Sequence, residues 1–230
     1  MTETKISFNR ESLKTPRSAA LAGIIFALLY GTSMVLINLS LTSDSVAGFT
    51  RLNTEAAGTV ALAFNLIPYS GIAFLWFIGV IRDRLSDLED RLFATVFLGS
   101  GLLFLALTFI GSALSAGVLS SYAIDSNIIF QSGLLVYNRA ILYQIFNIYA
   151  IRMAGVFMIS LASIWLRTGT MRRRWAYLTY VLALVLLLSI DISPWITLIF
   201  PVWVLGVSGY ILVRNLHNPP RDQDAGDMKS

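Results

Sequence analysis

Arg152 is a charged side chain inside a long apolar run, and this position restricts the groups that can lie next to it. It lies inside residues 147–174, NIYAIRMAGVFMISLASIWLRTGTMRRR, an apolar run that ends in Arg167, Arg172, Arg173 and Arg174. At about 1.5 Å per residue, Arg152 is about 20 Å from that arginine-rich end if the run is helical. An unpaired arginine at such a depth in a bilayer costs several kcal/mol. Arg152 therefore requires an acidic partner or an anionic ligand.

Two interpretations of Arg152 remain open. In the first, Arg152 anchors its helix to the outer loops through an ion pair, and the acidic candidates are Glu55, Asp191 and Asp125. In the second, Arg152 lines a polar cavity that binds an anionic group of a lipid or a solute, with Asn65 and Tyr149 as further binding residues. We favour the ion pair.

The aspartates Asp83, Asp87 and Asp90 form a second group with chemical potential. They lie in RDRLSDLEDR, residues 82–91, and invite comparison with the paired aspartates that hold magnesium and a diphosphate in membrane lipid transferases. Arginines stand three residues before and four residues after Asp87, a spacing at which charges on a helix surface pair with one another. We therefore favour a solvated, self-neutralising helical turn over a metal site.

The common catalytic and metal-binding motifs do not occur in this sequence. His217 is the single histidine, and there is no cysteine. This excludes a Ser-His-acid triad inside the membrane and any zinc or haem site that needs several imidazoles or thiolates. A Walker loop and a dinucleotide glycine fingerprint are absent as well. We expect no cofactor, no metal and no catalytic residue, and hence no enzyme.

The composition indicates an integral membrane protein. Hydrophobic residues make up 56% of the 230 positions and charged residues 13%, a balance that the polar side chains of a soluble domain could not cover. The formal net charge of +4 comes from short basic clusters between apolar runs. Such clusters indicate membrane topology, so we expect membrane lipid around the chain and no nucleic acid.

The apolar runs predict an all-α, polytopic transmembrane helix bundle. Six runs approach or exceed the length of about 20 residues that crosses a bilayer; they are 18–41, 57–81, 93–118, 147–166, 175–190 and 194–213. Residues 1–17 form a polar tail, and we expect residues 214–230 to be disordered. Because the apolar core of a secretory signal is shorter than the first run, we interpret that run as an uncleaved helix.

The basic residues sort to alternate connections. The N-terminal tail, residues 82–91, residues 167–174 and the C-terminal tail hold every Lys and Arg except Arg51, Arg139 and Arg152. By the positive-inside rule these four segments are cytoplasmic. The sequence therefore predicts six spans with both termini inside, in a multi-pass protein of the cell (inner) membrane.

Two outer connections are longer than simple turns. Residues 42–55 are polar and fit a short surface helix. Residues 119–146 mix apolar and polar side chains. They lie in the outer interface, which we favour, or they extend helices three and four above the bilayer, with the fourth helix beginning as early as Ser132.

Two features of the runs predict how the helices pack. Pro68 stands in the middle of the second run, where a missing backbone N–H bends a helix and leaves a carbonyl that neighbouring groups must satisfy. In the first run, small residues at spacings of four place one face against another backbone. We favour packing inside the bundle; the alternative is a second copy or a membrane-protein partner. The face comprises Ala19, Gly23, Ala27 and Gly31.

The start of the first helix, TPRSAALAGIIFALLY at residues 15–30, together with the six-span layout, resembles small six-helix bacterial integral membrane proteins of unknown function. The resemblance implies no site residues. Our leading hypothesis is a non-catalytic scaffold or accessory subunit. The alternatives are a small carrier or channel for a small or anionic solute, built around Arg152 and Asn65, and a lipid-modifying enzyme that uses the aspartates near Asp87. A carrier should contain a hydrated central cavity, whereas a scaffold should be a filled bundle.

Overall fold

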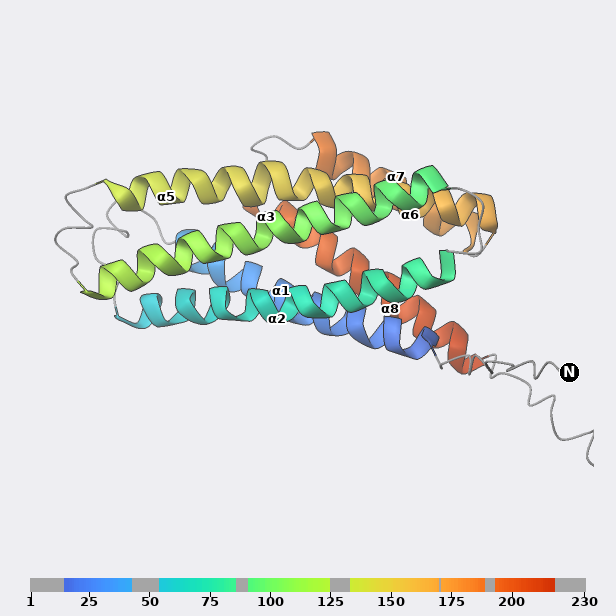
Figure 1. Ribbon diagram of the computed structural model, residues 1–230, viewed down its shortest axis with the longest axis horizontal. Coiled ribbons are helices and arrows are strands. Elements are labelled where there is room, and N and C mark those ends of the chain that lie inside the picture. Colours follow the sequence, from blue (N-terminus) through green and yellow to red (C-terminus); the bar gives the residue numbers. More distant parts are fainter. Residues whose placement is uncertain are drawn as a thin grey trace, which may run out of the picture.

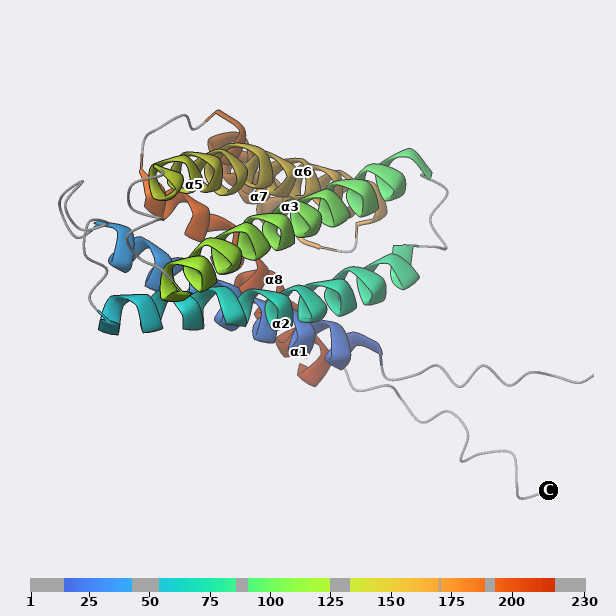
Figure 2. The same cartoon turned by 60° about the vertical axis from the view of Figure 1, so that its left-hand side comes forward.

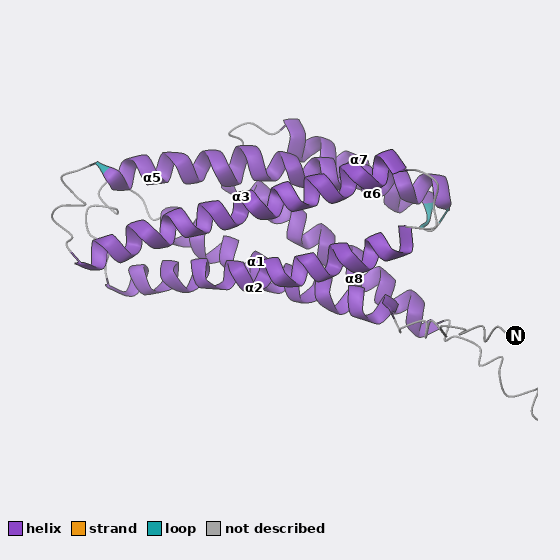
Figure 3. Ribbon diagram, in the orientation of Figure 1, coloured by secondary structure: helices purple, strands orange, loops and turns teal. Residues whose placement is uncertain are grey.

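The computed structural model describes residues 15–42, 54–85, 91–124, 133–169, 171–188 and 193–217. Every regular element in these ranges is a helix (Figure 3). The elements are α1 (Thr15–Thr42), α2 (Thr54–Leu85), α3 (Arg91–Ile124), α5 (Leu134–Tyr143), the π-helical segment η1 (Gln144–Ala150), α6 (Ile151–Thr168), α7 (Arg173–Leu188), the 3-10 segment η2 (Pro194–Leu198) and α8 (Ile199–His217).

The helices form one bundle in which α3 runs between α2 and the continuous rod α5–η1–α6 (Figure 1). On the other side of α2, α1 packs against α2 and α8, and α7 packs mainly on α6 (Figure 2). The first residue of α1 and the last residue of α8 lie at the same end of the bundle. The C-terminal end of α6 and the start of α7 lie at that end too, which we call the arginine end because it carries Arg82, Arg167 and Arg172–Arg174.

Five helical segments are long and apolar enough to cross a membrane. They are Ser18–Ser40, Gly58–Arg82, Leu92–Ser121, Val136–Thr168 and Trp195–Val213. They coincide with five of the six runs predicted from the sequence and confirm a multi-pass, all-α bundle. The remaining run corresponds to α7, which has 16 residues and a length of about 24 Å, less than the hydrocarbon thickness of about 30 Å. A crossing by α7 stays a prediction.

The connection 119–146 differs from the interpretation that we favoured. Its described residues do not form a separate interfacial helix, because α3 continues to Ile124 and α5 joins α6 through η1 without a break. The 34 residues of α3 measure about 51 Å, well beyond the hydrocarbon thickness. The extensions bury each other, since α3 packs against α5 and η1. Residues 43–53, which include most of the predicted surface helix 42–55, lie outside the described residues, as do residues 1–14 and 218–230. The predicted tail bounds were wrong for the described part, because Thr15–Arg17 belong to α1 and Arg214–His217 continue α8 as helix.

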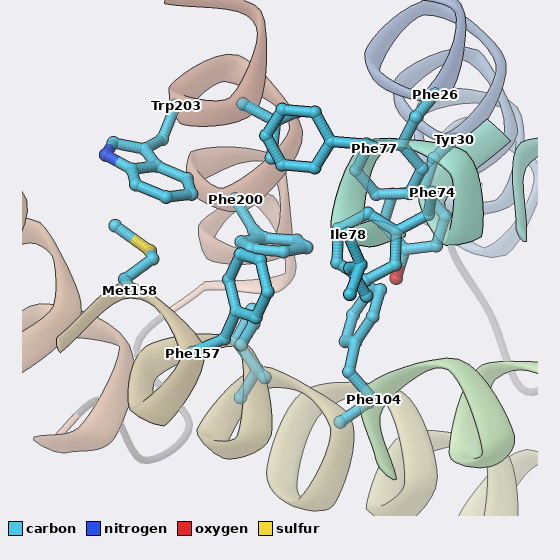
Figure 4. Close-up of a cluster of buried hydrophobic side chains, with 14 of the residues drawn as sticks. Phe26, Tyr30, Phe74, Phe77, Ile78, Phe104, Phe157, Met158, Phe200 and Trp203 are labelled. Carbon is cyan, nitrogen blue, oxygen red and sulfur yellow. The ribbon is translucent and has the colours of Figure 1, made fainter. Parts of the chain in front are cut away.

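Phenylalanine rings from five helices meet in the hydrophobic core of the bundle (Figure 4). The centroid distances are 4.6 Å for Phe26–Phe74, 5.4 Å for Phe74–Phe157 and 4.8 Å for Phe104–Phe200. Several of these pairs are edge-to-face, the arrangement that aromatic quadrupoles favour. We call this group the phenylalanine cluster; it consists of Phe26 from α1, Phe74 from α2, Phe104 from α3, Phe157 from α6 and Phe200 from α8.

The carbonyl freed by Pro68 is satisfied by a neighbouring helix, as the sequence predicts. Pro68 cannot donate to the carbonyl of Phe64, four residues earlier. Ser112 Oγ on α3 donates to that oxygen at 3.1 Å. Ser33 Oγ on α1 donates to the adjacent carbonyl of Ala63 at 2.6 Å. The interruption in α2 is thus stabilised from both sides by buried hydroxyl groups.

Hydrogen bonds between side chains hold α7 against the bundle. Tyr180 and Ser163 of α6 share a hydrogen bond of 2.6 Å between their hydroxyl groups. Trp203 Nε1 of α8 donates to Thr179 Oγ1 at 2.9 Å. These bonds place the short helix with a defined rotation and depth, because inside a bilayer a polar side chain gains most from a partner in the protein.

Candidate functional residues

Arg152 is the second residue of α6, two residues after the last residue of the π-helical segment. Its side chain is half-buried. Helical side chains lean toward the N-terminus of their helix, so Arg152 leans away from the arginine end. That direction leads a long cationic side chain toward the outer interface, where its charge is hydrated at lower cost. Single π-helical turns inside α-helices are frequent at functional sites, so Arg152 remains a candidate functional residue.

Two described contacts define the neighbourhood of Arg152. One turn along the helix, Gly155 is so close to α7 that a Cβ there would lie 3.0 Å from Leu187 and 3.2 Å from the carbonyl oxygen of Ala183. On the other side of Arg152, η1 packs against η2. Along its helical rod, Arg152 therefore lies between the contact with the end of α7 and the contact with η2. The chain between those two elements contains Asp191.

The acidic candidates lie beyond the described side chains. Glu55 belongs to the first turn of α2, but its side chain is not described, and Asp125 and Asp191 fall outside the described ranges. Within the described part of the chain, Arg152 forms no ion pair. The three pairings therefore stay predictions. Asp191 is the best supported, because the elements that flank it in the sequence are the ones packed on either side of Arg152.

Asn65 and Tyr149, the other predicted binding residues, are both exposed. Tyr149 precedes Arg152 by three residues on the same helical rod and therefore shares its side of the helix. Asn65 belongs to α2, which lies across α3 from that rod. In the ranges that the structure describes, no hydrogen bond joins Asn65 or Tyr149 to Arg152. In the core, α2 and α6 meet through an apolar contact, the ring pair Phe74–Phe157.

The small-residue face of α1 is used inside the chain. Gly23 is buried, and a Cβ at Gly23 would overlap Ser208 Oγ of α8 and lie 2.8 Å from the ring of Phe77 in α2. A partner cannot use a face that two helices of the same chain already cover, so association with a partner would need another surface. The outcome is the same along the face: Ala19 and Ala27 are buried and Gly31 is half-buried.

The buried hydroxyl groups are the feature that the sequence analysis did not single out. Ser33 and Ser112 bridge helices, and Tyr30 shares a side-chain hydrogen bond with Thr108. Among the described residues, Ser208 Oγ is the buried side-chain oxygen without a hydrogen-bond partner; it lies against Gly23. Serines in apolar runs were a usable signal, but their partners depend on tertiary contacts.

Asp87 and Asp90 lie outside the described residues, and the side chain of Asp83 is not described. The choice between a self-neutralising helical turn and a metal site therefore stays a prediction. In the described ranges, no group of His, Asp or Glu side chains could hold a metal ion. No family model matches the chain, and comparisons with curated proteins and with solved structures found no match.

Proposed function

We propose that this chain is a non-catalytic, multi-pass membrane protein that acts as a scaffold or accessory subunit. The observation that supports this role is the phenylalanine cluster, which places rings from α1, α2, α3, α6 and α8 in contact at the core of the bundle. A solute pathway along the axis would have to displace rings whose centroids are 4.6–6.4 Å apart. A filled and rigid core suits a protein that works through its outer surfaces.

The alternative role, a small carrier or channel for a small or anionic solute, relies on Arg152 and Asn65. Such a role needs polar groups that converge on a hydrated passage. Asn65 is exposed on α2, and Arg152 is half-buried on the far side of α3. This separation favours the scaffold over the carrier.

For the location we propose the inner membrane of a bacterial cell, with the arginine end in the cytoplasm. The support is the gathering of Arg82, Arg167 and Arg172–Arg174 at one end of the bundle, which matches the positive-inside rule. Fusions of a cytoplasm-active and a periplasm-active reporter after His217 test this orientation. Activity of the periplasmic reporter would reverse it.

A flux measurement tests the proposed role. The purified chain is reconstituted in liposomes, and the entry of chloride, nitrate and phosphate is followed by stopped-flow fluorescence. We expect rates equal to those of empty liposomes for the wild type and for Arg152→Leu. A flux above the background that Arg152→Leu abolishes, and that the exposed-site control Val202→Ala leaves intact, would overturn the scaffold in favour of the carrier.

A further inference from the structure

We propose that the outer face of α2 is the docking surface for α2 of a second copy of this chain, paired about a twofold axis with the two Asn65 amides bonded to each other. The inference deepens the proposed scaffold role by naming one partner. We call this face the α2 stripe; it consists of Leu62, Asn65, Tyr69, Ile72, Trp76 and Gly79.

The α2 stripe has the geometry of a helix-pairing seam. Its positions follow one another at alternating spacings of three and four residues, the repeat that keeps one seam facing a partner helix. The larger apolar residues of the stripe are exposed: Leu62 by 54%, Tyr69 by 65%, Ile72 by 53% and Trp76 by 66%. At Gly79 an added Cβ would meet nothing within 4 Å, so this end of the stripe admits a second backbone.

Asn65 distinguishes the stripe from an ordinary lipid-facing surface. It is exposed inside the span Gly58–Arg82, about 10 Å from the outer end of that span. No hydrogen bond of its amide is found within the described ranges. Hydrocarbon offers no partner to an amide, and asparagine side chains in membrane helices stabilise association by bonding across the interface. Gln144 is exposed as well, but it lies about 35 Å from Arg167, beyond the hydrocarbon.

The chemistry of an amide favours an identical partner. A carboxamide carries both donors and an acceptor, so two copies related by a twofold axis satisfy each other. A different partner would need its own hydrogen-bonding group at the same depth, whereas a second copy supplies one of matching chemistry by symmetry. Residues 62–79 contain no charged side chain, so no like charges meet when the stripe faces its own copy. The small-residue face of α1 cannot serve this purpose, because α8 and α2 cover it.

Disulfide trapping tests the dimer directly, because the chain has no cysteine of its own. Ile72→Cys and Gly79→Cys are oxidised in native membranes and compared with Leu103→Cys on α3 and Val202→Cys on α8, exposed positions away from the stripe. We expect covalent dimers from the stripe positions and not from the controls. Equal yields at all four positions, or none at the stripe positions, would overturn the proposal.

The role of the amide is tested by resonance energy transfer between labelled chains in detergent. Asn65→Leu is expected to raise the dissociation constant of the dimer about tenfold, whereas Asn65→Gln keeps an amide and most of the affinity. Asn65 is exposed in the single chain, so helix content and unfolding should match the wild type and exclude misfolding. An unchanged constant in Asn65→Leu would refute the proposal. The liposome flux assay does not depend on dimerisation, so a failed dimer would leave the scaffold standing with another partner.

Discussion

Ser112 and Pro68 are expected to be energetically coupled through the carbonyl of Phe64. In the wild type, Ser112→Ala removes the hydroxyl that donates to this oxygen at 3.1 Å, and Pro68 offers no backbone N–H in its place. A hydrogen bond of this kind in a membrane protein contributes about 0.6 kcal/mol on average and up to about 1.7 kcal/mol. A buried acceptor left without a donor costs about 1–3 kcal/mol. We therefore expect Ser112→Ala to lower the free energy of unfolding by about 1–2 kcal/mol.

The same substitution should have a smaller effect when residue 68 can donate. In Pro68→Ala the backbone N–H of residue 68 bonds the carbonyl of Phe64 as in an uninterrupted helix. Pro68 is exposed, so its replacement leaves no buried cavity. We expect Ser112→Ala to cost at most about 0.5 kcal/mol in this background, which gives a coupling free energy of about 1 kcal/mol in the double-mutant cycle.

Reversible unfolding in mixed micelles, titrated with sodium dodecyl sulfate and followed by far-ultraviolet circular dichroism, measures both costs. Ser100→Ala is the matched control on the same helix, because Ser100 is also buried but bonds carbonyls of its own helix. Its cost should be the same with Pro68 and with Pro68→Ala. If Ser112→Ala costs equally in both backgrounds, the bond from Ser112 does not compensate for the proline and our reasoning is wrong.

Three further perturbations follow from the contacts. Gly23→Ala should destabilise the bundle by about 1–3 kcal/mol through overpacking. Ser208→Gly should restore part of that loss, because the added Cβ also meets the ring of Phe77 at 2.8 Å; additive costs in the same unfolding assay would contradict the contact with Ser208. Arg152→Asp should reduce the folded yield in membranes, and the double variant that also carries Asp191→Arg should recover this yield. If the double variant does not recover the yield, Asp191 is not the partner of Arg152. Tyr180→Phe should increase amide hydrogen exchange in α7 while leaving α3 unchanged, because it removes the hydroxyl that bonds α6; equal exchange would show that this bond does not hold the helix.

Several features followed from the sequence because they depend on local chemistry. A backbone in hydrocarbon must satisfy its own polar groups, so long apolar runs had to be helices, and five of the predicted runs coincide with spanning segments. The need for a donor near Pro68 followed from the structure of proline alone. The separation of about 20 Å between Arg152 and the arginine cluster followed from counting helical rise, and the depth of Arg152 in a membrane stays a prediction.

Only the tertiary structure decided which faces meet. Lipid is as apolar as leucine, so inner and outer faces of a membrane helix carry similar hydrophobicity, and the pattern cannot tell them apart. The sequence could therefore place Gly23 on a packing face, but it could not show that Ser208 of α8 packs against it. For the same reason, only the folded chain shows that Ser33 and Ser112 donate to the carbonyls of α2. The continuation of α3 to Ile124 was not the favoured interpretation for a related reason: it packs against α5 and η1, and this tertiary contact is not visible in the sequence pattern. The sequence thus determined where long apolar helices form, and packing determined what the polar side chains on them contact.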